Sequence, residues 1–424
     1  MTGVDLVRNS ALAGRVVLWE ESARDGAQAK TLMSAGFRTW VATEQGRMFG
    51  LDGPAHVVFS AGFPAVGKEE FEATRRVAVE AGEHVSPSAV CRGTPADVLE
   101  ACRAVAGSPH ARVMIVVPSS DQMADAMLHR PAAEALRATP DLVRMARDAF
   151  PDVVPDVCFA DAPRADVGLI AERAEAVTDA GAGVVLVADT IGDLMPHQTA
   201  QLFGRLKEQV SDQVVLASHL HNDLGLALAN TLEVIRSGVR VVSSSWLGIA
   251  ERSGLVATEQ LLYLLAAKSE ACGVSTAWWT EPDLARLSAI ARAVSAETGI
   301  PLLVTTPIVG TGVGTISTGT PFVRPATFQP FDPRTVGITP TVVLTQLASA
   351  RVLEAVAERI GYPALDSETI REALQWVKSE AYRRNTAVVP DADLARFLGA
   401  RRNDAMASPH GAEPAGRPAV GVAG

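Results

Sequence analysis

Short runs rich in Val and Ile alternate with Ala-rich segments of helical periodicity over the first 250 residues. This alternation of short apolar runs and longer amphipathic segments is typical of βα units. Eight runs predict strands, at 16–21, 56–64, 84–92, 111–120, 153–161, 183–190, 213–221 and 239–248. Eight units over about 250 residues match the size of a parallel (β/α)8 barrel.

The segments between these runs predict helices at Lys68–Ala81, Pro95–Val105, Val167–Ala180, Pro196–Val210 and Leu224–Ser237. Gly82, Gly181 and Gly238 follow three of them, where a left-handed cap is expected. A doubly wound open sheet is the competing fold, but no Gly-rich dinucleotide turn follows the first strand. We therefore expect an α/β protein with a TIM barrel over 16–290, preceded by an N-terminal leader at 1–15.

The pattern changes after residue 255. Residues 256–299 have helical periodicity, 305–314 form a Gly- and Thr-rich segment that predicts a loop, and 341–400 predict a small, mainly helical region. The last residues, rich in Ala, Gly and Pro without periodicity, are typical of disorder. We expect a linker and C-terminal accessory subdomains at 291–400 and a disordered tail at 401–424.

Composition excludes several classes of partner. A formal net charge of -10 without a basic stripe argues against nucleic acid. No apolar span reaches the roughly 20 residues needed to cross a bilayer, and no basic region followed by an apolar block marks a signal peptide. The four cysteines are scattered, which is typical of reduced thiols in a cytoplasmic protein; Cys158 is expected in the core, with a nucleophilic role as the alternative.

Two histidines mark the end of the seventh predicted strand. His219 and His221 are two residues apart, so an extended backbone points both imidazoles to one face. Such a pair is either a chelate or two hydrogen-bonded core histidines. Asp25 follows the first predicted strand, and in a parallel barrel both strand ends open on the same face. The sequence therefore predicts a metal site made by Asp25, His219 and His221.

Several spaced motifs carry a family resemblance. They are Arg24-Asp25-Gly26-x-Gln28, Ala61-Gly62-Phe63-Pro64, Asp189-Thr190-x-Gly192, His219-x-His221-Asn222-Asp223-x-Gly225 and Gly248-x-x-Glu251-Arg252-x-Gly254. In order and spacing they resemble the DRE-TIM metallolyases. Residues 307–310 and 325–333 are similar to the accessory subdomain of the homocitrate synthase and 2-isopropylmalate synthase branch, and the resemblance extends over about 16–400.

The resemblance implies a homodimeric enzyme that condenses acetyl-CoA, or another acyl-CoA, with a 2-oxo acid. Asp25, His219 and His221 would hold a divalent cation, with Mg²⁺ or Mn²⁺ favoured and Zn²⁺ as the alternative. Arg24 would bind substrate and stabilise charge on the ketone oxygen, or else serve as an ion-pair partner of Asp25. Thr190 and Asp161 are expected to bind substrate, and Glu20 and Glu251 are expected to take part in catalysis. The alternative role of Asp161 is that of a structural partner of Arg164.

The chain departs from the family pattern mainly at polar positions. Ser60 stands where the family has a carboxylate, Met123 where it has a His, and Ala160 where it has a Glu. Two expected Asn are Leu247 and Leu255, and the element that supplies a catalytic His is replaced by a segment that ends at Pro321. Because acid and base groups each contribute typically 10²–10⁴-fold, these losses keep two other hypotheses open. One is a lyase or aldolase that acts on a 2-oxo or hydroxy acid without acyl-CoA, and the other is a non-catalytic family member.

Overall fold

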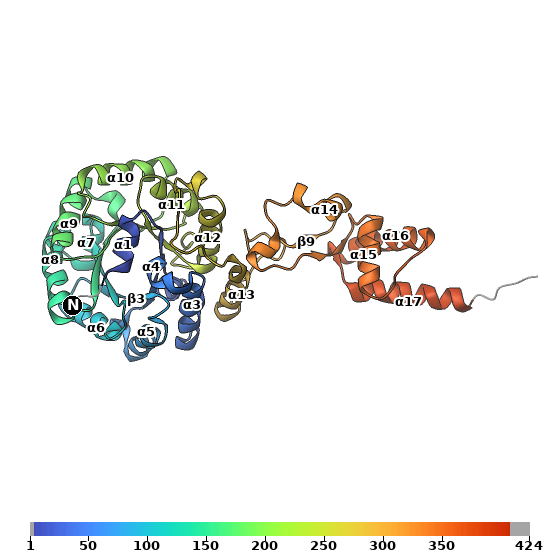
Figure 1. Cartoon of the computed structure of the whole chain (residues 1–424), viewed down its shortest axis with the longest axis horizontal. Coiled ribbons are helices and arrows are strands. Elements are labelled where there is room, and N and C mark those ends of the chain that lie inside the picture. Colours follow the sequence, from blue (N-terminus) through green and yellow to red (C-terminus); the bar gives the residue numbers. More distant parts are fainter. Residues whose placement is uncertain (1–3, 408–424) are drawn as a thin grey trace, which may run out of the picture. The chain divides into compact units, whose positions relative to one another are not determined.

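The chain forms a closed barrel of eight parallel strands (Figure 1). The computed structural model describes residues 4–407. β8 pairs in parallel with β1, with Val17 opposite Val241, and this pairing closes the sheet. All eight strands lie within the predicted runs: β1 Val17–Glu20, β2 Val57–Gly62, β3 Ser86–Arg92, β4 Arg112–Pro118, β5 Val154–Ala160, β6 Val185–Asp189, β7 Leu216–Leu220 and β8 Val241–Ser244. The predicted (β/α)8 barrel is confirmed.

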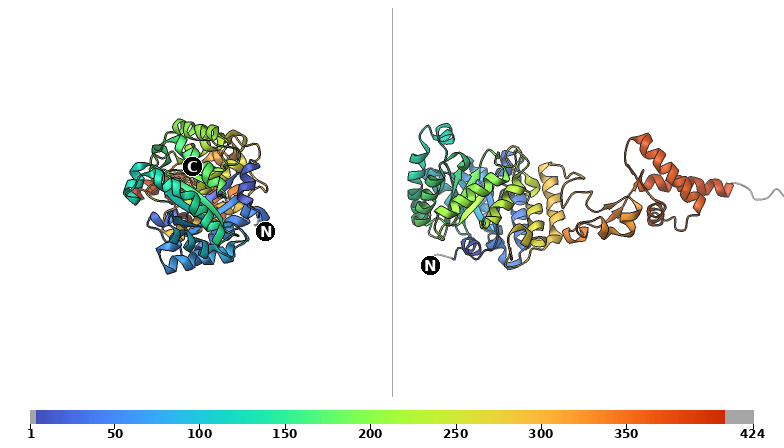
Figure 2. Two further views of the ribbon diagram at one scale, coloured as in Figure 1. Left: turned by 90° about the vertical axis from the view of Figure 1, so that its left-hand side faces the viewer. Right: turned by 90° about the horizontal axis from the view of Figure 1, so that it is seen from above.

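Helices surround the strands, as the further views in Figure 2 show. Most of the barrel's layer is made by α3 Ala35–Arg47, α5 Lys68–Ala81, α6 Pro95–Val105, α8 Ala132–Ala149, α9 Val167–Asp179, α10 Pro196–Gln209, α11 Ala227–Arg236 and α12 Thr258–Ala267, and α13 Leu287–Thr298 follows them. The left-handed caps at Gly181 and Gly238 are confirmed by their positive φ angles. The cap expected at Gly82 is wrong, because its φ is -63°. There glycine is needed for space instead, since a Cβ would lie 2.2 Å from Ser108 Oγ.

The barrel interior is apolar over most of its depth. Alternation along the strands turns Trp19, Cys158 and Ala217 inward, where they form one buried cluster with Val7. Val7 belongs to α1, Leu6–Leu12, so part of the segment expected as an N-terminal leader packs into the barrel core. Its burial follows from the apolar residues that this short helix presents to the barrel.

A buried ion-pair network joins α1 to two strands. Arg112 of β4 contacts Asp156 of β5 at 2.6 Å and Asp5, the N-cap of α1, also at 2.6 Å. The guanidinium and the Asp156 carboxylate are almost fully shielded from solvent. Because a lone buried charge is strongly unfavourable, each member of this network depends on the others.

Two buried carboxyl groups lie between β1 and α12. Glu20 accepts hydrogen bonds from Ser22 and Thr258, and Glu259 accepts one from the Leu247 backbone N–H. Burial is the main reason why the pKa of each carboxyl group is raised to about 7, despite the hydrogen bonds that favour ionisation. Both groups are therefore sensitive to pH near neutrality.

The other described residues form a second compact unit over 314–334 and 339–407. Its core is built by α15 Ala350–Arg359, α16 Ser367–Arg384 and α17 Asp391–Ala407, with Val352, Val377 and Leu394 buried between them. It also contains α14 Gly319–Val323 and short strands β9 Thr315–Ile316, β10 Thr341–Val342, β11 Leu344–Thr345 and β12 Val388–Val389. The prediction that disorder begins at residue 401 is wrong, because α17 continues to Ala407. Residues 408–424 of the expected tail lie outside the described residues.

Within residues 4–407, no helix is both long enough and apolar enough to span a bilayer. The four cysteines are free and buried. Burial raises the pKa of the Cys158 thiol to about 12, so this side chain stays a neutral part of the core at neutral pH.

We expect Arg112→Met to lower the free energy of unfolding of the barrel by about 3–5 kcal/mol, because it leaves the buried Asp156 carboxylate without its counter-charge. Urea unfolding followed by tryptophan fluorescence measures the change. The double variant R112M/D156L, which removes both buried charges, should recover most of the loss. A double variant as unstable as Arg112→Met would contradict this account.

We also expect the barrel to lose stability as the pH rises from about 5 to 8. The unfolded chain releases the Glu20 and Glu259 protons near the ordinary pKa, whereas the folded chain holds them until about 7. Stability is therefore fully present below the ordinary pKa and is lost as the pH passes the raised one, by up to about 3 kcal/mol per group. Melting temperatures across this range test the effect.

The matched variants Glu20→Gln and Glu259→Gln resemble the protonated groups and should flatten the profile. Glu233→Gln, at a partly exposed residue of α11 that pairs with Arg236, serves as the control and should leave the slope unchanged. Parallel profiles for the wild type and the two buried variants would show that these carboxyl groups do not titrate as described.

Candidate metal centre

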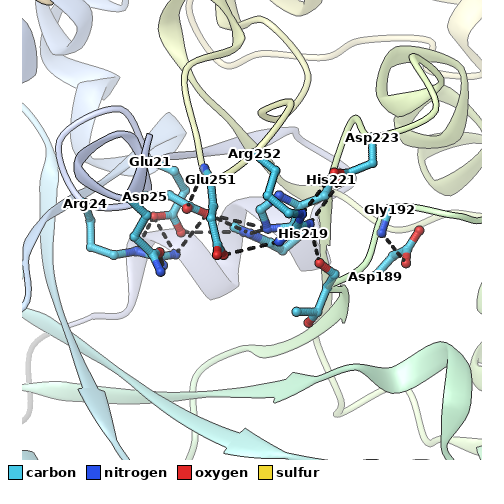
Figure 3. Close-up of polar contacts among 12 residues, drawn as sticks. Glu21, Arg24, Asp25, Asp189, Gly192, His219, His221, Asp223, Glu251 and Arg252 are labelled. Carbon is cyan, nitrogen blue, oxygen red and sulfur yellow. Dashed lines mark hydrogen bonds and ion pairs between the residues drawn. The ribbon is translucent and has the colours of Figure 1, made fainter. Parts of the chain in front are cut away.

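Asp25, His219 and His221 converge at the carboxyl ends of β1 and β7 (Figure 3). The two histidines stand two residues apart at the end of β7, so both rings turn into the barrel mouth. The His219 Nε2 atom lies 3.1 Å from Asp25 Oδ2 and 3.2 Å from His221 Nε2, and His221 Nε2 lies 3.8 Å from Asp25 Oδ2. All three side chains are buried. The three predicted ligands thus face one point.

The donor atoms fit a divalent cation. Ligand atoms about 2.1 Å from one ion at right angles lie about 3 Å apart, which is close to two of the separations observed. Burial and the neighbouring His219 lower the pKa of His221 to about 3, so its ring is neutral and able to coordinate. Burial alone would raise the pKa of Asp25, but Arg24 and His219 outweigh it and hold that pKa well below its usual range. The Asp25 carboxylate and the neutral His221 ring are therefore ready to bind, with the His219 ring beside them.

Arg24 lies beside this cluster. Its guanidinium donates from Nε to Glu21 Oε2 at 2.9 Å, whereas the Asp25 carboxylate is 3.8 Å from its NH2 group. The ion pair with Asp25 that the sequence left open is thus the longer of the two contacts. Although burial opposes its charge, the pairing with Glu21 and Asp25 raises the pKa of Arg24. A permanent positive charge stands next to the metal ligands.

Glu20 and Glu251 occupy different places. The Glu20 carboxylate contacts Thr258 and Ser22, on the side of β1 opposite the inward-facing Trp19, so the structure does not bring it to the metal cluster. Glu251 reaches the cluster through its backbone, whose N–H donates to Asp25 Oδ1 at 3.1 Å. Its carboxylate is 3.3 Å from Arg252 and partly exposed.

Thr190 and Asp161 are joined through the main chain. The Asp161 N–H donates to Thr190 Oγ1 at 2.9 Å, which leaves the threonine O–H as a donor. The Asp161 carboxylate is fully buried, accepts from Ser120 and pairs with Arg164 at 2.6 Å. The Asp161 side chain is therefore the partner of Arg164, as the alternative interpretation predicted. Asp161 contacts Thr190, a predicted substrate-binding residue, through its backbone N–H.

A second arginine ties three loops together. Arg252 donates to the Asp223 carboxylate and, at 2.6 Å, to the carbonyl oxygen of Thr190. Gly192, with φ +69°, lies against His221 and Asp223, where a Cβ would be 2.5 Å from Asp223 Oδ2. This close contact explains why position 192 is a glycine, because a side chain there would displace the turn that carries His221.

The carboxylate beside Arg24 belongs to Glu21, which directly follows β1, and not to β2, where the family resemblance led us to expect one. Ser60, where a β2 carboxylate was expected, accepts the Trp19 indole N–H at 2.9 Å, and Glu21 supplies the contact to Arg24. The signal was present in the alternation of β1, since Glu21 follows inward-facing Trp19 by two residues. Ala160 and Leu255 are buried where polar groups were expected.

Comparison with curated proteins supports the resemblance. The 2-isopropylmalate synthase of one Prochlorococcus marinus strain is 29% identical over 402 residues, covering 90% of this chain and 72% of that protein. That of a second strain is 30% identical over 402 residues, with the same coverage. The 2-isopropylmalate synthase 1 of Caldanaerobacter subterraneus subsp. tengcongensis is 28% identical over 407 residues, covering 93% of this chain and 99% of that protein.

Solved structures agree on the barrel. The hydroxymethylglutaryl-CoA lyase of Pseudomonas aeruginosa matches 68% of this chain and 94% of its own with a TM-score of 0.55, at 21% identity, which shows the fold alone. A family model described as HMGL-like matches residues 16–294, well over half of the chain. With this match and the synthase relatives, the protein belongs to the HMGL-like family, the DRE-TIM group that its motifs indicated.

Proposed function

We propose that this protein is a divalent-cation-dependent synthase that joins the acyl group of an acyl-CoA, with acetyl-CoA as the first candidate, to the ketone carbon of a 2-oxo acid. The product would be an alkylmalate-type or homocitrate-like acid. The observation that carries the proposal is the convergence of Asp25, His219 and His221 beside Arg24 at one mouth of the barrel. The synthase relatives, whose similarity extends over about nine-tenths of the chain, favour this reaction over others of the family.

The residues around the cluster define how a 2-oxo acid would be held. The cation, when bound, would supply positive charge for the ketone and carboxylate oxygens. The Thr190 hydroxyl, whose oxygen accepts the Asp161 N–H, is free to donate its proton toward a substrate carboxylate. Arg24 stands where its charge would stabilise negative charge growing on the ketone oxygen as the new bond forms.

The loss of expected polar groups favours a second candidate. Ser60 and Ala160 provide no carboxylate, and there is no histidine between His221 and His410. A lyase or aldolase that acts on a 2-oxo or hydroxy acid without acyl-CoA would not need the base that removes a proton from the acyl-CoA methyl group. This reaction needs the cation and Arg24 but no group that activates a thioester.

The full-length protein loaded with Mg²⁺ or Mn²⁺ should release free thiol when given acetyl-CoA and the correct 2-oxo acid. We expect one member of a panel with aliphatic and acidic side chains to react, and Arg24→Gln to lower kcat by about 10²–10³-fold, as for the loss of a group that stabilises an oxyanion. Thiol release is followed by a disulfide dye. Silence with every 2-oxo acid would contradict the synthase proposal.

The same panel, without acyl-CoA and in D₂O, separates the two candidates. Metal-dependent exchange of the C3 protons or consumption of a 2-oxo acid alone would favour the lyase or aldolase. A protein that binds neither the cation nor a 2-oxo acid would be the non-catalytic family member.

We expect apo protein, prepared with a chelator, to bind one Mn²⁺ per chain, and His219→Ala or Asp25→Ala to weaken that binding at least about 100-fold, because each removes one of three ligands. Isothermal titration calorimetry measures the affinity. His197→Ala, which removes an exposed histidine of α10, is the matched control and should bind like the wild type. Equal affinity in all four proteins would place the cation elsewhere.

A further inference from the structure

We propose that Glu21 is a positioning residue that joins Arg24 to His219, so that the guanidinium and one metal ligand are set by a single carboxylate. The inference rests on the proposed function and deepens it, since it names a residue that prepares the same site. In Figure 3, Glu21, Arg24 and Asp25 lie together on one side of the two imidazoles.

The backbone of β1 directs Glu21 into the barrel. It is the residue after the last of β1, Glu20, and stands two residues beyond Trp19, which is turned into the core. The alternation of side chains along a strand sends Glu21 to the same face. Its side chain is 2% exposed, so an unpaired charge there would be strongly unfavourable.

One carboxylate oxygen fixes the guanidinium. Glu21 Oε2 accepts from Arg24 Nε at 2.9 Å and lies 2.9 Å from its NH2 group, so two nitrogens of the planar fork meet one oxygen. The remaining nitrogen of the fork donates to Gln28 at 3.3 Å. Arg24 is therefore held by Glu21 and Gln28 at a distance from Asp25, and Asp25 keeps Oδ2, the oxygen that faces both imidazoles, for the cation site.

The other carboxylate oxygen faces a metal ligand. Glu21 Oε1 is 3.8 Å from His219 Nδ1, on the side of the ring away from Asp25 and His221. When Nε2 of a neutral imidazole binds a cation, its proton stays on Nδ1, and that N–H usually points to a carboxylate or carbonyl oxygen. A small rotation of the ring or of Glu21 would close this contact. His221 differs, because its Nδ1 atom is buried without a hydrogen-bond partner among residues 4–407.

Glu21 also balances the charge of Arg24. Arg24 and a divalent cation are both positive and would repel each other across the site. Among the described residues, Glu21 and Asp25 are the carboxylates in contact with Arg24, and Asp25 belongs to the metal cluster. Glu21 therefore neutralises Arg24 without using a metal ligand, which allows the guanidinium to stand beside the cation.

The test compares Glu21→Ala and Glu21→Gln with the wild type, each as the full chain. Mn²⁺ affinity of the apo proteins is measured by calorimetry, and their thermal unfolding is measured without metal. We expect Glu21→Ala to weaken Mn²⁺ binding about 10- to 100-fold, as for other carboxylates that orient a metal-bound histidine. Glu21→Gln keeps the shape and an acceptor oxygen but not the charge, so it should recover part of that loss.

Asp97→Asn is the matched control. Asp97 pairs with Arg92, the last residue of β3, at 2.5 Å. Within residues 4–407, no hydrogen bond or ion pair joins Asp97 to a metal ligand. Its Mn²⁺ affinity should equal that of the wild type. If Glu21→Ala does not fold, the isosteric Glu21→Gln variant decides the question, with a loss of at least threefold expected and wild-type affinity contradicting the proposal.

Kinetics separate positioning from a purely structural role. With a reactive 2-oxo acid, Glu21→Gln should lower kcat more than it raises KM, because Arg24 acts on charge that develops during the reaction. Wild-type Mn²⁺ affinity in both Glu21 variants, with normal binding by the wild type, would overturn this inference alone. A wild-type protein that binds no Mn²⁺ would instead overturn the proposed function on which it rests.

Discussion

Closure of eight parallel strands into a barrel is the constraint on which the site depends. Parallel strands all end at one face, so residues almost 200 positions apart, Asp25 and His219, come within 3.1 Å without any local sequence signal joining them. Alternation along β7 then decides that His219 and His221 share a direction. The metal cluster is thus a consequence of barrel closure and strand geometry together.

Charge pairing organises both ends of this barrel. At the end where the strands begin, Arg112 is neutralised by Asp156 and by Asp5, the N-cap of α1, which attaches the first helix to the sheet. At the end where they finish, Arg24 is neutralised by Glu21, Arg164 by Asp161 and Arg252 by Asp223. Each arginine has its own carboxylate, so the metal ligands themselves remain available.

Under the proposed function, the replaced polar groups around the cluster would concern proton transfer more than binding. The groups expected to hold a cation and a 2-oxo acid are present and converge, whereas Ser60 hydrogen-bonds to Trp19, and Ala160 and Leu255 are buried. Glu21, the residue after β1, places beside Arg24 a carboxylate that β2 lacks. Under the proposed function, the residues that would hold the cation and a 2-oxo acid are present beside Arg24, whereas the groups that would move protons differ from the family pattern.

The sequence by itself determined the eight strands, several helix boundaries and the pair of inward-facing histidines, because these follow from periodicity within one segment. It did not determine that Glu20 faces Thr258, that Asp161 binds Arg164 by its side chain and Thr190 by its backbone, or that Glu21 holds Arg24. Helix α1 in the barrel core and the extension of α17 to Ala407 were likewise not anticipated. Which carboxylate meets which arginine depends on packing between segments distant in the chain, and only the tertiary structure decides that.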